Sequence, residues 1–305
     1  MLKKRILNKE SGLLFYGLTP PKENTDKEKI ENIANKQIER LNGVEIDGLV
    51  LYDIQDESSR TNMPRPFPYL PTLAPDYYSE NYLQRLNIPK IIYKSVGKYS
   101  SDNLRAWIEN GTRNFDCSVF VGSPSKSQVS NLSLNEAYKI KQNTGSPLIL
   151  GGVTIPERHT KKGDEHIRLY EKIDNGCSFF ISQCVYNINN TRDFLSDYYY
   201  FSVENNTDLV PIIFTLTPCG SQKTLEFMKW LGIDIPKWLN NDLIHSKDIL
   251  ANSIEVCKSI ATDIFDYSKS KNIPIGFNIE SVAIRKEEID ASIELLKDIK
   301  EMINK

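Results

Sequence analysis

Eight short apolar runs are spread along the 305-residue chain, and they constrain its fold more than any other feature. They are rich in β-branched residues and nearly continuous in apolar character, which is typical of parallel strands buried on both faces. Stretches of helical length or helical apolar spacing separate most of them. The expected strands are 12–18, 46–53, 89–95, 115–122, 147–152, 178–183, 209–216 and 273–280.

This alternation predicts an α/β fold, a single (βα)8 TIM barrel over residues 1–305. Eight such units need ~250 residues, which the chain supplies. The stretch 220–271 carries more than one helix, so we expect an extra helix before the last strand. A doubly wound sheet is the alternative, but no glycine-rich dinucleotide fingerprint follows any strand. The other expected helices include 76–86, 101–110, 131–144, 163–175, 190–203 and 285–303.

The composition and net charge of the chain indicate which classes of binding partner to expect. Hydrophobic residues make up 40% of the chain, charged residues 26%, and the net charge is −2. Acids and bases are interspersed, so we expect neither a nucleic-acid groove nor a membrane-binding face. The basic start, MLKKR, is followed by no apolar run long enough for a signal peptide or a spanning helix. A cytoplasmic location is therefore expected.

The cysteines and histidines show no metal-binding pattern. The five cysteines form no CxxC pair and lie mostly inside apolar runs, so we expect reduced core residues. The three histidines are widely spaced and lack an HxxxH pattern. No metal site is expected.

Polar side chains gather where the predicted strands end, which is where barrels of this type hold their active sites. Some of them will be solvated loop residues or helix caps, and the others are candidates for binding or chemistry. These strand-end residues include Asp53, Gln55, Asp56, Glu57, Arg60, Ser123, Glu157, His159, Gln183 and Glu280.

Five segments, in order along nearly the whole chain, carry a resemblance to a known family. They are Pro20–Pro21–Lys22, TIPERH (154–159), KIDNGCSFFISQCVYN (172–187), TLTPCGSQKTLEFMKWLGIDIPKWL (215–239) and the turn Arg285–Glu287. Together they resemble the methylenetetrahydrofolate reductase family, flavin-dependent (βα)8 barrels that reduce methylenetetrahydrofolate to methyltetrahydrofolate.

The resemblance implies a folate site and a flavin (FAD) site. Gln183 matches the glutamine that hydrogen-bonds the pterin ring, and a side-chain amide offers a donor and an acceptor side by side. Ser123 lies where the family's carboxylate contacts both rings. Arg60 lies in a long Pro-rich loop, residues 52–73, that is suited to the glutamate tail of a folate. The residues at the implied FAD positions are Gly122, Ile155, His159, Glu165, Arg168 and Lys172.

Several positions depart from the family's pattern. Gly17 stands where the family has the glutamate that opens the one-carbon bridge, and glycine cannot transfer a proton. The other departures are Val121–Gly122–Ser123 for Arg-Gly-Asp, Ile155 for an aromatic residue, Tyr93 for a histidine and Glu171 for a basic residue. Because most of these losses fall on the flavin site, we expect FAD binding to be weak or absent.

The chain could compensate for the missing acid at Gly17 in two ways. A general acid contributes ~10²–10⁴-fold in rate, so a replacement is needed for the reaction to persist. Glu280 ends an apolar strand, where burial would raise its pKa, and Asp53 and Glu57 after the second strand are alternatives. The mechanism could also change, with NADH or NADPH passing hydride directly to the iminium form of the folate.

The leading interpretation is an oxidoreductase of folate and one-carbon metabolism. The alternative is a folate- or pterin-binding accessory subunit that kept the barrel and lost the chemistry. An enzyme acting on another pterin or methyl carrier is a third reading. The sequence leaves open whether the chain pairs with a partner subunit or with itself.

Overall fold

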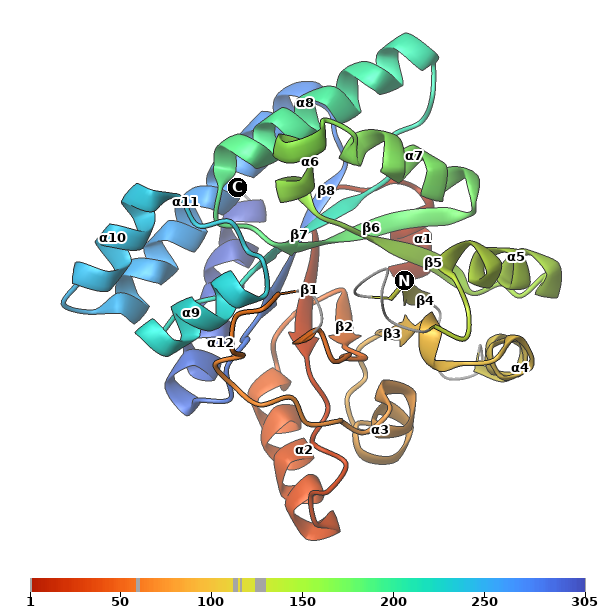
Figure 1. The fold of residues 1–305 in the computed structure, drawn as a ribbon, viewed down its shortest axis with the longest axis horizontal. Helices are drawn as coiled ribbons and strands as arrows, with labels where there is room; N and C mark the ends of the chain where they lie inside the picture. The colour runs from red at the N-terminus through yellow and green to blue at the C-terminus, as the bar shows by residue number, and fades with distance from the viewer. Residues whose placement is uncertain (1, 59–60, 112–114, 116, 124–129, 305) are drawn as a thin grey trace.

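The computed structural model describes residues 2–58, 61–111, 115, 117–123 and 130–304, and these residues form a closed barrel of eight parallel strands (Figure 1). Each strand pairs in parallel with the next one along the chain, and β8 pairs with β1. The predicted (βα)8 TIM barrel is confirmed. The strands are β1 (Leu13–Leu18), β2 (Gly48–Leu51), β3 (Lys90–Ser95), β4 (Cys117–Val121), β5 (Ile149–Thr154), β6 (Cys177–Cys184), β7 (Ile212–Leu216) and β8 (Ile275–Glu280).

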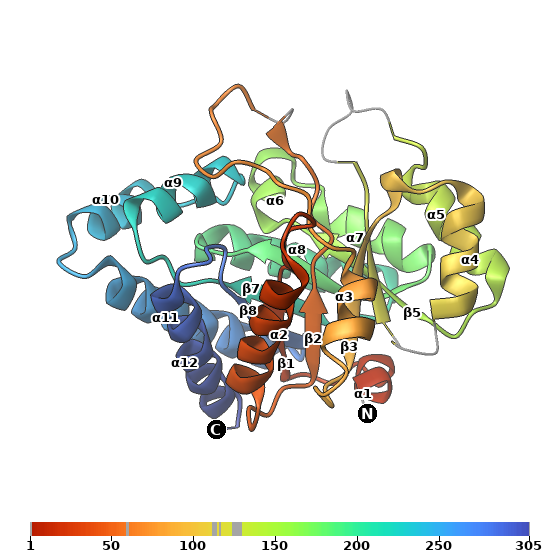
Figure 2. The ribbon, with the colours of Figure 1, turned by 90° about the horizontal axis from the view of Figure 1, so that it is seen from below.

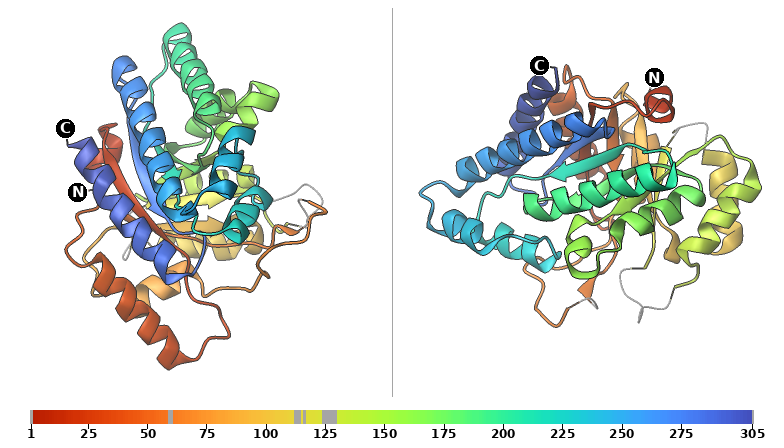
Figure 3. Two further views of the ribbon diagram at one scale, coloured as in Figure 1. Left: turned by 90° about the vertical axis from the view of Figure 1, so that its left-hand side faces the viewer. Right: turned by 90° about the horizontal axis from the view of Figure 1, so that it is seen from above.

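Helices surround the barrel, and the segment before β8 is longer than expected. Two short helices, α9 (Gln222–Trp230) and α10 (Lys237–His245), precede the long α11 (Ile249–Lys271) where one extra helix was predicted. The remaining helices are α2 (Lys27–Leu41), α3 (Pro75–Tyr82), α4 (Ser101–Gly111), α5 (Leu134–Thr144), α6 (Pro156–Lys162), α7 (Glu165–Asp174), α8 (Ile188–Asn205) and α12 (Lys286–Ile303). A short 3-10 helix, Val96–Lys98, follows β3. Figure 3 shows α8 and α11 as two long helices on one side of the barrel.

The interior of the barrel is packed, and it is closed at one end. Alternate strand residues such as Phe15, Val119 and Phe179 point inward and are fully buried. The first helix, α1 (Leu2–Leu7), adds Leu2 and Ile6 to this inner cluster. Figure 2 shows α1 at the end of the barrel opposite the loop that follows β2. Among the described residues α1 covers this end, so we expect a ligand to reach the interior from the carboxyl ends of the strands, the barrel mouth.

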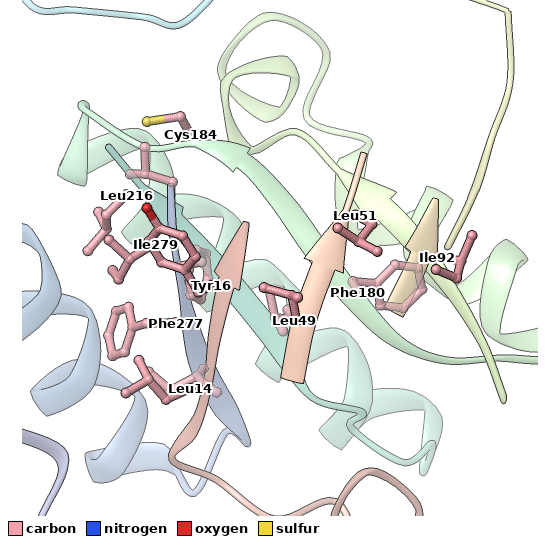
Figure 4. Close-up of a cluster of buried hydrophobic side chains, with 14 of the residues drawn as sticks. Leu14, Tyr16, Leu49, Leu51, Ile92, Phe180, Cys184, Leu216, Phe277 and Ile279 are labelled. Carbon is pink, nitrogen blue, oxygen red and sulfur yellow. The ribbon is translucent and has the colours of Figure 1, made fainter. Parts of the chain in front are cut away.

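The alternate residues of the strands pack outward against the helices. In β1, Leu14 and Tyr16 belong to this outer layer (Figure 4). The Tyr16 hydroxyl lies 2.8 Å from Ser292 Oγ on α12, which ties the helix to the strand. This period of two explains why both faces of each strand are apolar in the sequence. All five cysteines are buried, as expected.

None of the helices among the described residues combines the length and apolar composition needed to cross a bilayer.

One buried ion pair joins β3 to α3. The side chain of Lys94 is 2% exposed, and its Nζ lies 3.1 Å from Asp76 Oδ2. Asp76 also accepts a hydrogen bond from Trp107 Nε1 at 2.5 Å. The ammonium lies 4.3 Å from the ring centroids of both Tyr99 and Trp107. A buried ammonium depends on such partners because water cannot reach it.

We expect Asp76→Ala to lower the free energy of unfolding by about 3–5 kcal/mol, because it leaves the Lys94 ammonium buried without a counter-charge. The matched control is Asp263→Ala, which breaks the exposed pair between Asp263 and Arg192 and should cost less than about 1 kcal/mol. Urea unfolding of both variants measures the difference. Equal losses in the two would contradict the stabilising role of the buried pair.

Candidate active site

The barrel mouth is lined by polar residues that end the strands, and Glu280 is central among them. Glu280 is the last residue of β8, and it lies opposite Gly17 of β1 in the parallel register. Its side chain is only partly exposed. Burial raises the pKa of Glu280 to about 7, and the hydrogen bond from Tyr52 opposes that rise. Near neutral pH this carboxyl can therefore both hold and release a proton.

Glu280 belongs to a short hydrogen-bonded chain that starts inside the barrel. The side-chain amide of Asn278 donates to the Tyr52 hydroxyl at 2.8 Å, and Tyr52 is hydrogen-bonded to Glu280. The Tyr52 ring meets the Tyr93 ring edge-on, with centroids 4.8 Å apart. Burial raises the pKa of both tyrosines well above the usual value, so both remain neutral donors.

Sequence reasoning missed the roles of Asn278 and Tyr52, although a signal for one was present. Asn278 and Glu280 are two residues apart in an otherwise apolar strand, so both must face the same side of it. Two polar residues on the inner face of a buried strand indicate a shared polar network. Tyr52 follows the end of β2. Its contacts with Asn278 and Tyr93 form only when the barrel closes, so the sequence gives no signal for them.

Gly17 is required by the position of Tyr52. A Cβ atom at residue 17 would lie 2.8 Å from both Cε2 and the hydroxyl oxygen of Tyr52, and 3.1 Å from Cβ of Glu280. These separations are shorter than van der Waals contact, and the Tyr52 ring is held by its hydrogen bonds and by Tyr93. The tyrosine thus occupies the space that a side chain on β1 would need.

A second buried acid lies nearby at the start of α6. Glu157 is 7% exposed, and its pKa is raised to about 8, mainly by burial and to a smaller extent by Asp234 and Glu165. Its Oε2 has no hydrogen-bond partner among the described residues. Both Glu157 and Glu280 act electrostatically on the buried Cys184. At neutral pH Glu157 is mostly protonated and has a proton to donate.

The other predicted acids have different surroundings. Asp53 accepts a hydrogen bond from the Ser95 backbone N–H at 2.8 Å and pairs with Lys98, so it links the loops after β2 and β3. Glu57 is partly buried in the loop after β2, where it acts electrostatically on Arg65. Glu280 is the one of the three that extends from a barrel strand. Arg60, predicted to bind substrate, lies outside the described residues.

The predicted pterin-binding residues lie at the mouth. Gln183 is partly buried near the end of β6, and its Nε2 donates to the backbone carbonyl of Leu231 at 2.7 Å. Ser123 is exposed just beyond β4. The carbonyl of Gly122 accepts a hydrogen bond from Gln55 Nε2 at 3.1 Å, which connects the loops after β2 and β4.

The Pro-rich loop after β2 covers one side of the mouth. Its residue Met63 accepts a hydrogen bond from Trp230 Nε1 at 3.0 Å, which fastens the loop to α9. The guanidinium carbon of Arg65 lies 4.7 Å from the Trp230 ring centroid and 5.3 Å from that of Phe227. Arg65 Nε and Nη1 are buried without a hydrogen-bond partner among the described residues. The loop and α9 also lie next to each other in Figure 2.

Two residues at the implied FAD positions are held by acidic neighbours. His159 is 5% exposed, and its Nε2 lies 2.9 Å from Asp197 Oδ2 on α8. Arg168 Nε lies 3.7 Å from Asp164 Oδ2, one turn earlier on the chain. A phosphate that binds His159 Nε2 or Arg168 Nε would have to compete with these carboxylates.

Lys172 and Glu165, two further residues at the FAD positions, are hydrogen-bonded to the backbone at the end of β5. Lys172 Nζ donates to the Val153 carbonyl at 2.5 Å, and burial lowers the pKa of Lys172. Glu165 is fully buried and accepts a hydrogen bond from the Ile155 backbone N–H at 2.8 Å. A pyrophosphate needs several converging donors, and the residues at these positions, among those described, are each directed at a different protein partner. They do not fit FAD as a phosphate cradle.

A small cavity lies outside the barrel, between β1, α2 and α12. Its volume is about 100 Å³, and its lining includes Leu18, Arg40 and Ile293. Ligand sites for drug-sized molecules measure roughly 300–1,000 Å³, so this cavity is too small for a pterin with its tail. The barrel mouth is the candidate site because the hydrogen-bonded chain from Asn278 through Tyr52 to Glu280 ends there.

We expect Gly17→Ala to lower the free energy of unfolding by about 1–3 kcal/mol, because the new methyl overlaps the Tyr52 ring. In a Tyr52→Ala background the same change should cost much less, so a double-mutant cycle by urea unfolding will show coupling. Gly122→Ala is the control, since a Cβ there meets nothing nearer than Leu134 at 3.7 Å. Equal costs in both backgrounds would contradict the packing described.

Two comparisons with known proteins find similarities to this chain, one to a family model and one to solved structures. The family model for methylenetetrahydrofolate reductase matches residues 126–270. A solved protein from Clostridium thermocellum is 53% identical, with a TM-score of 0.89 over 99% of this chain and 100% of that one, and it binds two copies of 5-methyl-5,6,7,8-tetrahydrofolic acid. The 7,8-dihydropteroate synthase from Vibrio fischeri ES114 is 11% identical, with a TM-score of 0.48 over 97% and 95% of the two chains.

No curated protein matches the sequence. The matched segment begins before α5 and reaches to the end of α11, and it contains TIPERH and the strand that carries Gln183. The chain belongs to the methylenetetrahydrofolate reductase family.

Proposed function

We propose that the barrel mouth binds a reduced folate and that the chain reduces methylenetetrahydrofolate to methyltetrahydrofolate, with Glu280 as the proton donor. The observation that carries this proposal is a carboxyl of pKa about 7, partly exposed at the mouth and paired in register with Gly17. The Clostridium thermocellum protein, 53% identical, binds a methylated reduced folate, which supports a folate as the ligand.

Reduction of methylenetetrahydrofolate to methyltetrahydrofolate consumes one proton and one hydride. The proton from Glu280 goes to the folate nitrogen N10 as the bond between that nitrogen and the bridging carbon breaks. The carbon remains on N5 as an iminium, and addition of hydride makes it a methyl group. The hydrogen bond with Tyr52 holds the Glu280 carboxyl in place at the mouth, where its raised pKa keeps a proton available near neutral pH.

We assign the hydride donor to a reduced nicotinamide, NADH or NADPH, bound directly over the folate. The residues at the FAD positions do not form a phosphate cradle, so no step in this proposal passes through a flavin. Direct transfer needs only that the two rings be held face to face. The wall formed by the Pro-rich loop and α9 packs around the buried, stacked rings of Phe227 and Trp230 on one side of the mouth.

Gln183 is proposed as the pterin contact. Its Nε2 now donates to the Leu231 carbonyl, so binding would exchange or share that hydrogen bond. Leu231 ends α9, which also holds the Pro-rich loop. A pterin at Gln183 would therefore lie beneath this loop.

A second candidate function is folate binding without reduction, as an accessory subunit of one-carbon metabolism. The absence of a side chain at Gly17 and the engaged residues at the FAD positions favour this reading, since both remove parts of the family's chemistry. It differs from the first in one respect: the protein would bind folate but consume no reduced nicotinamide.

We expect Glu280→Gln to slow nicotinamide oxidation in the presence of methylenetetrahydrofolate by ~10²–10⁴-fold, the usual contribution of a general acid. Binding of 5-methyltetrahydrofolate, measured by titration calorimetry, should stay within a few-fold of the wild type. Glu57→Gln is the comparator, because it removes another acid of the mouth and should leave the rate nearly unchanged. A visible spectrum taken first will record whether the purified protein carries flavin. Full activity in Glu280→Gln would rule out this proton donor, and folate binding without any wild-type turnover would support the accessory role.

The pKa of Glu280 also predicts how stability depends on pH. Its folded-state pKa of about 7 lies above the ordinary value of 4.5, so the native state holds the proton more tightly than the unfolded state. The resulting stabilisation is complete below the unfolded pKa and is lost as pH rises through about 7. Glu280→Gln should therefore be more stable than the wild type above pH ~8, by up to about 3 kcal/mol. The difference should vanish near pH ~4 in urea unfolding. A constant difference across this range would contradict the raised pKa.

A further inference from the structure

Two histidines and an aspartate meet where α6, α7 and α8 pack together, away from the proposed folate contacts. His159 comes from α6, His166 from α7 and Asp197 from α8 (Figure 1). One ligand atom from each lies within 4.8 Å of the other two. The imidazole rings of His159 and His166 meet edge-on, with centroids 5.3 Å apart.

The hydrogen bonding of this cluster is incomplete. His159 is 5% exposed, and its Nε2 is bonded to Asp197 Oδ2 at 2.9 Å. Its Nδ1, and also Nδ1 of His166, are buried with no hydrogen-bond partner among the described residues. Asp164 acts electrostatically on His166, and its buried Oδ1 also has no hydrogen-bond partner among the described residues. Buried polar atoms are nearly always paired, so several unpaired ones in one place call for a ligand.

We propose that His159, His166 and Asp197 bind one divalent transition-metal ion of the Zn²⁺ class. Two imidazoles and a carboxylate are a ligand set that such ions favour, with a fourth position left for water or for Asp164. Two nitrogen or oxygen ligands on one such ion are at most ~4.2 Å apart. The widest separation here, 4.8 Å, therefore closes by a small side-chain adjustment.

The ion would fasten α6 to α7 and α8. Because α6 begins at Pro156, it carries Glu157 at the edge of the mouth. The site departs from the expectation of no metal, which rested on spacing alone. Gly163, at φ +65°, ends α6 and so lets two histidines seven residues apart approach each other.

The test is titration calorimetry of the full chain with ZnCl₂ after removal of metal by a chelator, and visible absorption with Co²⁺ in its place. We expect one ion per chain in the wild type. His166→Ala and Asp197→Asn should each weaken binding by more than about tenfold, the loss that changes outside the ligand shell already produce. His245→Ala, which removes the exposed histidine at the end of α10, should bind as the wild type does.

A thermal melt provides the second readout. Excess Zn²⁺ should raise the Tm of the wild type and of His245→Ala, but not of His166→Ala, because only a ligand of the native state stabilises it. The melt without metal shows whether His166→Ala is folded. The proposal is overturned if the wild type shows no saturable binding, or if His245→Ala loses binding as His166→Ala does.

Discussion

The partly buried carboxyl of Glu280 is the constraint around which the barrel mouth is arranged. An ionised carboxylate away from water is costly, so the protein must either neutralise it or bond it. Both happen here: its pKa rises to about 7, and Tyr52, itself held by Asn278, is hydrogen-bonded to it. The Tyr52 ring leaves no room for a side chain on β1, and Gly17 meets that condition. With α1 closing the opposite end, the carboxyl is reached from the mouth alone.

The family resemblance gains a physical explanation from this arrangement. The position that holds the family's acid and the position of Glu280 are neighbours in register on adjacent strands, β1 and β8. An acid at either position lies at the same level along the barrel axis, so an acid on β8 can donate a proton to the same bound ring as an acid on β1. The FAD positions changed in another way: His159, Arg168 and Lys172 each have a partner within the protein. A barrel can thus keep one site and rebuild another, because loops and strand ends vary independently of the packed strands.

Much of the fold was predictable because buried parallel strands have a strong signature in sequence. The run 273–280 predicted β8, and the expected rise in the pKa of Glu280 at its end is found as well. Other features depend on contacts that spacing does not encode. The helix α1 has only Leu2 and Ile6 as an apolar face, too little for a signal in six residues. The partnership of Tyr52 with Asn278 joins residues 226 positions apart. The meeting of His159 with Asp197 depends on how α6 packs against α8.

The most direct test of this account is a crystal structure of the protein with 5-methyltetrahydrofolate. We predict that the pterin lies in the barrel mouth beneath the loop after β2, with Gln183 at its edge. Glu280 should lie within hydrogen-bond reach of the folate nitrogens, ~2.6–3.2 Å directly or through one water. A folate bound only outside the barrel, or one in the mouth while Glu280 contacts nothing but Tyr52, would contradict the central claim.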